Sequence, residues 1–146
     1  MPHAIRIHAY GGPEVMRWEP HDPGEPGRGE ALIRQTAVGL NFIDVYERTG
    51  LYPTALPSGL GREGAGVVEA LGPGVRGLEI GARVAYVSSL AGSYAERRCM
   101  AADRLVTIPD GVSDRLAAAA MLKGLTAQFL LRRTHRVRKA DVVVIH

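Results

Sequence analysis

The sequence predicts a mainly β chain that ends in helices, an α+β fold whose strands form a partly open barrel. Three observations support this. Short stretches of β-forming residues recur through residues 1–112, separated by turns rich in glycine and proline. After residue 112 the apolar side chains change to helical spacing. A length of 146 residues provides one domain with a real core, and not two full domains.

Composition restricts the class of protein. No run of about 18 apolar residues occurs, so we expect no membrane span, and the N-terminus MPHAIRIHAY lacks the apolar region of a signal peptide. A single cysteine, Cys99, excludes an internal disulfide and suits a reducing compartment, so we expect a cytoplasmic protein. The net charge of +3 comes largely from residues 132–139, which have no aromatic residues among their charges. We therefore interpret them as a solvated helix end and expect no nucleic-acid partner.

Alternation and turn signals place the strands. Residues 4–9 alternate Ile5 and Ile7 with polar neighbours, and the turn after them returns the chain in a partner strand. Residues 30–40 form the longest predicted strand, and residues 79–87 are expected to contain a bulge at Gly81. The other predicted strands are residues 15–19, 65–71, 93–98 and 105–108.

The highest density of polar and conformationally special positions lies in residues 39–68. Asn41 is a favourable N-cap with Asp44 three residues later, which is a variant of the capping box. Gly50 is a fitting residue just past a helix end, so we expect a helix over Phe42–Thr49.

The C-terminal part changes character. Ser113 is the N-cap of a predicted helix, which mid-helix Gly124 divides into two parts. Its apolar side chains follow i, i+4, i+7 and i+11 spacing: Ala118, Leu122, Leu125 and Phe129. Residues 141–146, DVVVIH, lack alternation and predict a strand buried on both faces, as in a parallel sheet.

Two familiar ligand motifs are rejected. Residues 59–64 and 72–77 both satisfy G-x-G-x-x-G, but neither stands between a predicted strand and a predicted helix, as a dinucleotide site requires. A catalytic zinc needs three protein ligands and a structural zinc needs four, usually cysteines. With one cysteine and scattered histidines, we expect no metal.

The remaining plausible chemistry is hydride transfer by a cofactor that the protein orients. Asn41 offers a donor and an acceptor on one short side chain. Tyr46 and Tyr52 can stack on a flat ring and hydrogen-bond a carbonyl oxygen. The structural alternatives are an N-cap for Asn41, packing for the tyrosines, and a solvated helix face for Lys123 and Thr126.

The segments NFIDVYERTGLYP and LPSGLGREGAGVV closely resemble the zinc-free quinone oxidoreductases, the zeta-crystallin-like group of the medium-chain dehydrogenase/reductase superfamily. GGPEVMRW, GARVAYVSSLAGSYAER and AAAAMLKGLTAQFLLRRTH resemble further blocks of that family in the same order, so the resemblance covers nearly the whole chain. It implies a GroES-like catalytic domain over residues 1–112. Residues 113–146 would be a helical connector and the first strand of a truncated dinucleotide-binding (Rossmann) domain, which is otherwise absent from this sequence.

The resemblance also implies an activity and a site. The activity is NADPH-dependent reduction of a small-molecule quinone. Asn41, Tyr46 and Tyr52 would line the nicotinamide and quinone pocket as the catalytic residues. Asn41 and Tyr46 would hold the nicotinamide, with Lys123 and Thr126 beside it. Binding of NADPH by this chain alone stays an open question.

The zinc-dependent relatives give a further comparison. They carry a Cys where this chain has Asn41, and Gly-His-Glu where it has Gly61-Arg62-Glu63. Arg62 also departs from the small polar residue expected in the zinc-free group, which affects the shape of the pocket.

Two alternatives remain. One is reduction of an activated alkene, such as an enone, by the same hydride chemistry. The other is a non-catalytic GroES-like module that associates with itself, because an apolar strand at 142–145 with an open edge invites pairing. We therefore expect a homodimer or, as the alternative, a disordered C-terminus.

Overall fold

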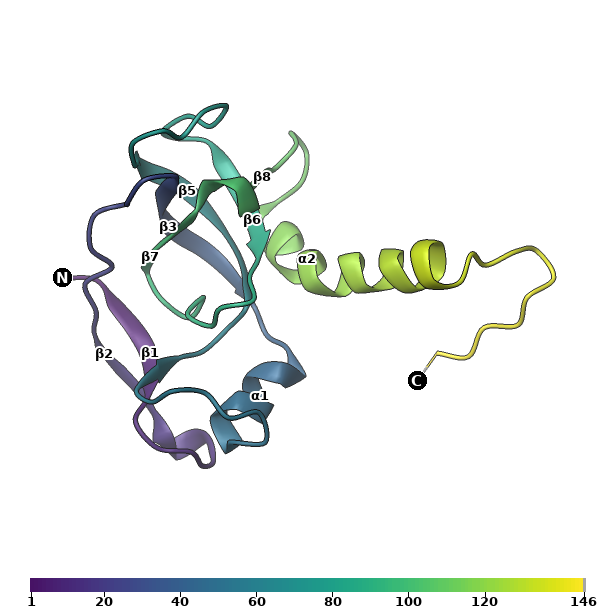
Figure 1. Cartoon of the computed structure of the whole chain (residues 1–146), viewed down its shortest axis with the longest axis horizontal. Helices are drawn as coiled ribbons and strands as arrows, with labels where there is room; N and C mark the ends of the chain where they lie inside the picture. Colours follow the sequence, from purple (N-terminus) through teal and green to yellow (C-terminus); the bar gives the residue numbers. More distant parts are fainter. Residues whose placement is uncertain (146) are drawn as a thin grey trace.

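A computed structural model describes residues 1–145 and shows strands followed by a long helix (Figure 1). The elements are β1 (His3–Ile7), η1 (Pro13–Val15), β2 (Met16–Pro20), β3 (Glu30–Gly39), α1 (Phe42–Thr49), β4 (Ser58–Gly59), β5 (Glu63–Leu71), β6 (Arg83–Val87), β7 (Arg97–Ala101), η2 (Ala102–Arg104), β8 (Val106–Thr107), α2 (Asp114–Gln128) and the π-helical η3 (Phe129–Thr134). Among residues 1–145, no helix combines the length and apolar character needed to cross a membrane.

The strands form two open sheets. Strand order is β2-β1-β4 in the smaller sheet and β7-β3-β5-β6-β8 in the larger one, and every strand pair described is antiparallel. The predicted hairpin of residues 4–9 and 15–19 is confirmed as β1 and β2. The sheets do not close into a barrel, and the expected mainly β fold with C-terminal helices is confirmed.

Segment 93–96 joins the two sheets. Its backbone N–H groups donate to carbonyls of Leu60, Gly61 and His3, and its carbonyls accept from Ile5 and Gln35. The strand predicted at 93–98 is therefore wrong in its position, because these residues bridge the sheets and regular pairing begins only at Arg97.

The strand predicted at 79–87 begins late, at Arg83. Gly81 has φ 88°, and Ala82 N donates to the Glu79 carbonyl at 3.1 Å. This geometry makes a turn where a bulge was expected, because a left-handed residue turns the chain out of the extended conformation.

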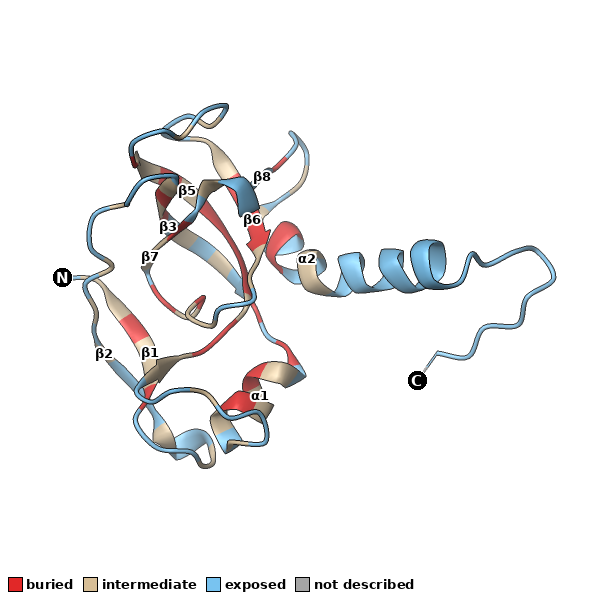
Figure 2. Cartoon of the chain, viewed as in Figure 1, coloured by how far each residue is buried: buried red, intermediate tan, exposed pale blue. Residues whose placement is uncertain are grey.

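The hydrophobic core has two clusters. One is formed by side chains from strands of the larger sheet and includes Ile33, Val68 and Tyr86, all at most 1% exposed. The other joins that sheet to the first turns of α2 through Ala117 and Ala118. From Lys123 onward the residues of α2 are exposed, and Figure 2 shows this end of the helix extending away from the strands. Only the beginning of α2 is therefore fixed by packing.

The predicted division of the C-terminal helix at Gly124 is wrong. α2 runs unbroken through Gly124, since the cost of a helical glycine, roughly 1 kcal/mol, does not by itself end a helix. The change in geometry comes instead at Phe129, where η3 begins.

The predicted strand at 141–146 is also wrong over its described part, residues 141–145; His146 lies outside the described residues. The side chains of Val142, Val144 and Ile145 are 74–92% exposed, and none of these residues pairs with a described strand. Apolar β-formers make a buried strand only when neighbouring strands and covering helices are available. Residues 1–145 supply neither at this place.

Candidate functional site

The N-terminus of α1 forms the framework of the site. Asn41 is its N-cap and Gly50, with φ 79°, ends it, as predicted. The Asn41 backbone N–H donates to Asp44 Oδ2 at 2.9 Å in the predicted capping box. Asp44 is 4% exposed and also accepts from the Tyr94 hydroxyl at 2.8 Å. These two hydrogen bonds to Asp44 fix the position of Asn41 at the end of the loop after β3.

The Asn41 side chain belongs to a three-residue network. Its Nδ2 donates to Glu63 Oε1 at 2.8 Å, and its Oδ1 accepts from Lys123 Nζ at 2.9 Å. Lys123 Nζ also donates to Glu63 Oε1 at 2.8 Å. The Lys123 side chain is 54% exposed while Glu63 is fully buried. The structure thus brings together two predicted site residues, on the α1 cap and on α2.

Glu63 is the member of this network that the sequence prediction missed. It begins β5, and its other oxygen, Oε2, accepts from the Leu122 backbone N–H at 2.6 Å. A signal was present, because Glu63 is a carboxylate directly before the small apolar run GAGVV, which the structure buries almost entirely. A charge in such a strand needs a partner, since lone buried charges are costly.

Three aromatic side chains lie along one side of α1. The rings of Tyr46 and Tyr52 meet edge to face with centroids 5.4 Å apart, and Phe42 stacks on Tyr46 at 6.4 Å. Tyr52 is 51% exposed and is held beside Tyr46 by a 3.1 Å backbone bond from its N–H to the Tyr46 carbonyl. The two predicted tyrosines therefore form one aromatic pair, in which Tyr52 is exposed and Tyr46 is half-buried.

Thr126 stands apart from these contacts. Its hydroxyl donates to the Leu122 carbonyl of its own helix at 2.8 Å, and the residue is exposed. Within residues 1–145 no hydrogen bond joins it directly to Asn41 or Lys123. Thr126 lies less than one helical turn after Lys123, with acceptor capacity left on its oxygen.

Arg62 is explained by a buried partner. Its guanidinium pairs with Glu47 Oε1 on α1 and donates to the Ser89 carbonyl. Glu47 is 1% exposed. Arg62 therefore fastens α1 to the loop after β6.

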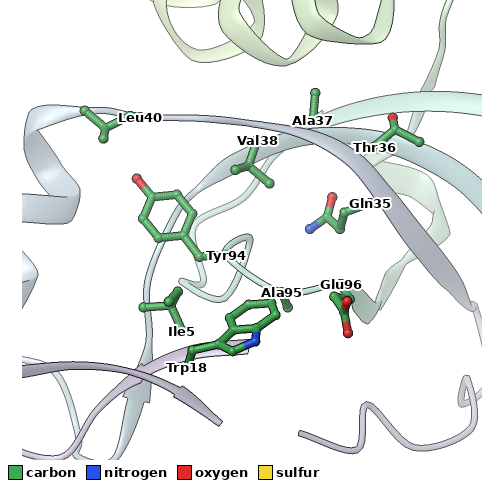
Figure 3. A pocket seen from close by; sticks show the side chains of 10 residues that line it. All are labelled: Ile5, Trp18, Gln35, Thr36, Ala37, Val38, Leu40, Tyr94, Ala95 and Glu96. Atoms are coloured by element: carbon green, nitrogen blue, oxygen red, sulfur yellow. The ribbon is translucent and has the colours of Figure 1, made fainter. Parts of the chain in front are cut away.

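A pocket of about 540 Å³ lies between β3 and the smaller sheet (Figure 3). Tyr94 on its wall donates to Asp44, and burial together with that carboxylate raises the pKa of the Tyr94 hydroxyl. The pocket is therefore linked to the first turn of α1. Sequence reasoning missed it because its walls come from distant segments. The lining residues are Ile5, Trp18, Gln35, Thr36, Ala37, Val38, Leu40, Tyr94, Ala95 and Glu96.

Within residues 1–145, no three His, Cys, Asp or Glu side chains gather closely enough to hold a metal ion. The contacts at Asn41 are instead those of an amide, a carboxylate and an ammonium.

The fold agrees with comparisons to known proteins. Residues 27–110 match the alcohol dehydrogenase GroES-like domain, and the chain belongs to that family. Within it, the expected resemblance to the N-terminal domain of the zeta-crystallin-like quinone oxidoreductases is confirmed by relatives that are quinone oxidoreductases.

Quinone oxidoreductase of Pseudomonas aeruginosa is 50% identical over 147 residues, which cover 100% of this chain and 45% of that protein. The crystal structure of Escherichia coli quinone oxidoreductase complexed with NADPH has a TM-score of 0.91 and 42% identity, covering 93% of this chain and 42% of that one. A 2-haloacrylate reductase of a Burkholderia species is 41% identical over 149 residues, covering 98% of this chain and 45% of that protein. The chain therefore spans less than half the length of the relatives it matches.

Proposed function

We propose that this chain is the catalytic half of an NADPH-dependent quinone reductase. The observation that carries the proposal is the amide of Asn41, held between Glu63 and Lys123 at the start of α1, together with the aromatic pair formed by Tyr46 on α1 and Tyr52 just after it. The similarity to quinone oxidoreductases, one of them crystallised with NADPH, supports the same activity.

The residues present fit the nicotinamide end of NADPH. A nicotinamide is a flat ring with a carboxamide, and the aromatic pair of Tyr46 and exposed Tyr52 offers rings for stacking. Asn41 retains one Nδ2 hydrogen and an Oδ1 lone pair beyond its internal bonds. Half-exposed Lys123 adds a positive charge beside them. When bound, NADPH would supply the hydride.

The phosphates of NADPH need a different place. A dinucleotide fingerprint holds a pyrophosphate only at the start of a helix. Residues 59–64 run from β4 into β5, and residues 72–77 form the turn after β5, so neither sequence opens a helix. We propose that residues beyond this GroES-like part hold the phosphates.

The chain's own residues then have distinct roles. Asn41 and Tyr46 orient the nicotinamide, and Tyr52 contacts the quinone with its exposed phenol. A quinone that accepts a hydride also takes up a proton, and water reaches the site because Tyr52 and Lys123 are both about half exposed. Thr126 provides an acceptor beside Lys123.

We propose that the reaction needs no zinc. The positions corresponding to two zinc ligands of related dehydrogenases carry an amide, Asn41, and a guanidinium, Arg62. Both side chains are already engaged, with Glu63 and Glu47 respectively. A cytoplasmic location is proposed on composition alone, from the single cysteine.

The test is made in a hybrid in which this chain replaces the aligned part of the Pseudomonas aeruginosa relative. Tyr52→Ala should lower kcat/KM for 1,4-naphthoquinone about tenfold or more, which corresponds to ~1.4 kcal/mol of lost transition-state stabilisation. Leu51→Ala is the matched control, because Leu51 is an exposed neighbour outside the aromatic pair, at 64% against 51% for Tyr52. Unchanged kinetics for Tyr52→Ala would remove that residue from the site.

A second candidate activity is reduction of an activated alkene. The similarity to a 2-haloacrylate reductase favours it, and the same hydride donor and aromatic pair would serve. The hybrid should be assayed with 1,4-naphthoquinone, 2-cyclohexenone and 2-chloroacrylate under one set of conditions. A higher kcat/KM for either alkene would replace the quinone as the substrate class.

Self-association remains a proposal as well. The side chains of Leu125, Phe129 and Leu130 are 49–59% exposed on α2 and η3, so an apolar surface is available. We propose a homodimer through it. Light scattering of the chain should give twice the monomer mass, and Phe129→Ser should reduce it; a monomer in both samples contradicts the proposal.

A further inference from the structure

Glu63 occupies a position that no packing argument explains. It is fully buried, it carries a carboxylate, and it touches three different parts of the chain. Oε1 accepts from Asn41 before α1 and from Lys123 on α2, while Oε2 accepts from the Leu122 backbone N–H. One carboxylate thereby connects β5, the cap of α1 and the middle of α2.

The charges decide how the Asn41 amide is oriented. Its Nδ2 faces the Glu63 carboxylate and its Oδ1 faces the Lys123 ammonium. A rotation of the amide by a half turn would place an oxygen against the carboxylate and N–H groups against the ammonium. Both contacts would become repulsive, so the network selects one orientation and fixes the direction of the remaining donor and acceptor.

A glycine leaves room for this carboxylate. Gly39 at the end of β3 pairs with Glu63 at the start of β5. A Cβ added at Gly39 would collide with the carboxyl and Cγ atoms of Glu63. A side chain at position 39 is therefore excluded by the space that Glu63 occupies, and not by the backbone conformation of Gly39. Replacing Gly39 would displace the Glu63 carboxylate without changing any charge.

We propose that Glu63 is a positioning residue of the hydride-transfer site, which sets the Asn41 amide and the Lys123 ammonium for the ligand, with Gly39 providing its space. This inference rests on the proposed function for its catalytic meaning. The contacts of Glu63 with Asn41 and Lys123 are a property of this chain and do not depend on that function. The two parts are therefore tested by separate measurements.

The first measurement is trace acylation of amines with acetic anhydride, read by mass spectrometry. The chain has two lysines, Lys123 and Lys139, so Lys139 is an internal reference. Acylation needs the free amine, so Lys123 in the wild-type chain should react several-fold more slowly than Lys139, although its side chain is 54% exposed. Equal rates in the wild type would overturn the proposal without any variant.

Two variants disturb Glu63 in different ways. Glu63→Gln removes the charge, and Gly39→Ala displaces the carboxyl group while keeping every charge. Both should raise the Lys123 rate about threefold or more and leave Lys139 unchanged, because a charge-assisted hydrogen bond is roughly twice as strong as a neutral one. Glu79→Gln, at an exposed position, is the matched control and should change neither rate. Unaltered Lys123 rates in folded variants overturn the proposal.

The second measurement is steady-state kinetics in the hybrid enzyme. Glu63→Gln and Gly39→Ala should lower kcat about tenfold with the KM for quinone unchanged, since misplacing an orienting group costs rate and not substrate contacts. If both variants keep the wild-type kcat while Tyr52→Ala loses activity, the positioning role is overturned and the proposed function stands. If the wild-type hybrid reduces no substrate, the proposed function is wrong, and so is the catalytic role of Glu63. Slow acylation of Lys123 would still show that Glu63 and Asn41 hold the Lys123 amine.

Discussion

Replacing Arg62 by Ala tests how strongly a buried carboxylate depends on one guanidinium. Glu47 is 1% exposed, its Oε1 is paired with Arg62, and its Oε2 has no other partner among the described residues. Removing one member of a buried ion pair costs about 3–5 kcal/mol, because the remaining charge stays buried without compensation. For a domain whose stability is of order 5–15 kcal/mol, that loss is a large fraction of the total.

Urea unfolding followed by circular dichroism measures the effect. With an m value of about 2 kcal/mol/M, a loss of ~4 kcal/mol lowers the midpoint by roughly 2 M. Adding Glu47→Gln to Arg62→Ala should recover part of the loss, since the uncompensated charge is then absent. Arg104→Ala is the control, because its pair with Asp103 is 72% and 78% exposed and such pairs contribute about 0–1 kcal/mol. A midpoint for Arg62→Ala equal to that of Arg104→Ala would refute the reasoning.

Two further predictions concern titrating groups. Hydrogen bonds from Thr36 and Arg83 hold the pKa of the Asp114 carboxyl below its ordinary value, so its stabilisation is present at neutral pH and is lost as pH falls through the lowered pKa. Asp114→Asn should therefore lower the urea midpoint at pH 7, with a difference that shrinks below about pH 4; a constant difference contradicts this. Burial, with Glu30 nearby, raises the pKa of the Cys99 thiol. Ellman's reagent at pH 8 should react more slowly with the folded chain than in urea, and equal rates would show that the thiol is unprotected.

Local signals were enough for parts of the fold. Both ends of α1 follow from its cap residues, Asn41 and Gly50, which act through contacts within one turn of the helix. β3 follows from its alternation and the first hairpin from its turn. In each case the determining interactions lie between residues close in the sequence.

The remainder depended on partners distant in the sequence. Val142–Val144 has strong β propensity, and no described strand lies beside it to pair with. Leu125 follows the apolar spacing of α2, yet it is 49% exposed, because the sheet contacts only the first turns of that helix. Periodicity identifies a face of an element and does not reveal what covers it.

The candidate site shows the same division. Asn41, Tyr46 and Tyr52 could be selected from one stretch of sequence, and the structure brings the two tyrosines together. The role of Glu63 depends on Lys123, sixty residues later in the chain. Only the folding of α2 against β5 joins these residues. No local pattern predicts such a contact.

The most direct test of the central claim is a titration of the hybrid with NADPH, followed by nicotinamide fluorescence and then by addition of 1,4-naphthoquinone. The account predicts saturable binding that Asn41→Ala weakens, and one hydroquinone formed for each NADPH oxidised. Saturable binding that is unaffected by Asn41→Ala, with no reduction of the quinone, would contradict it.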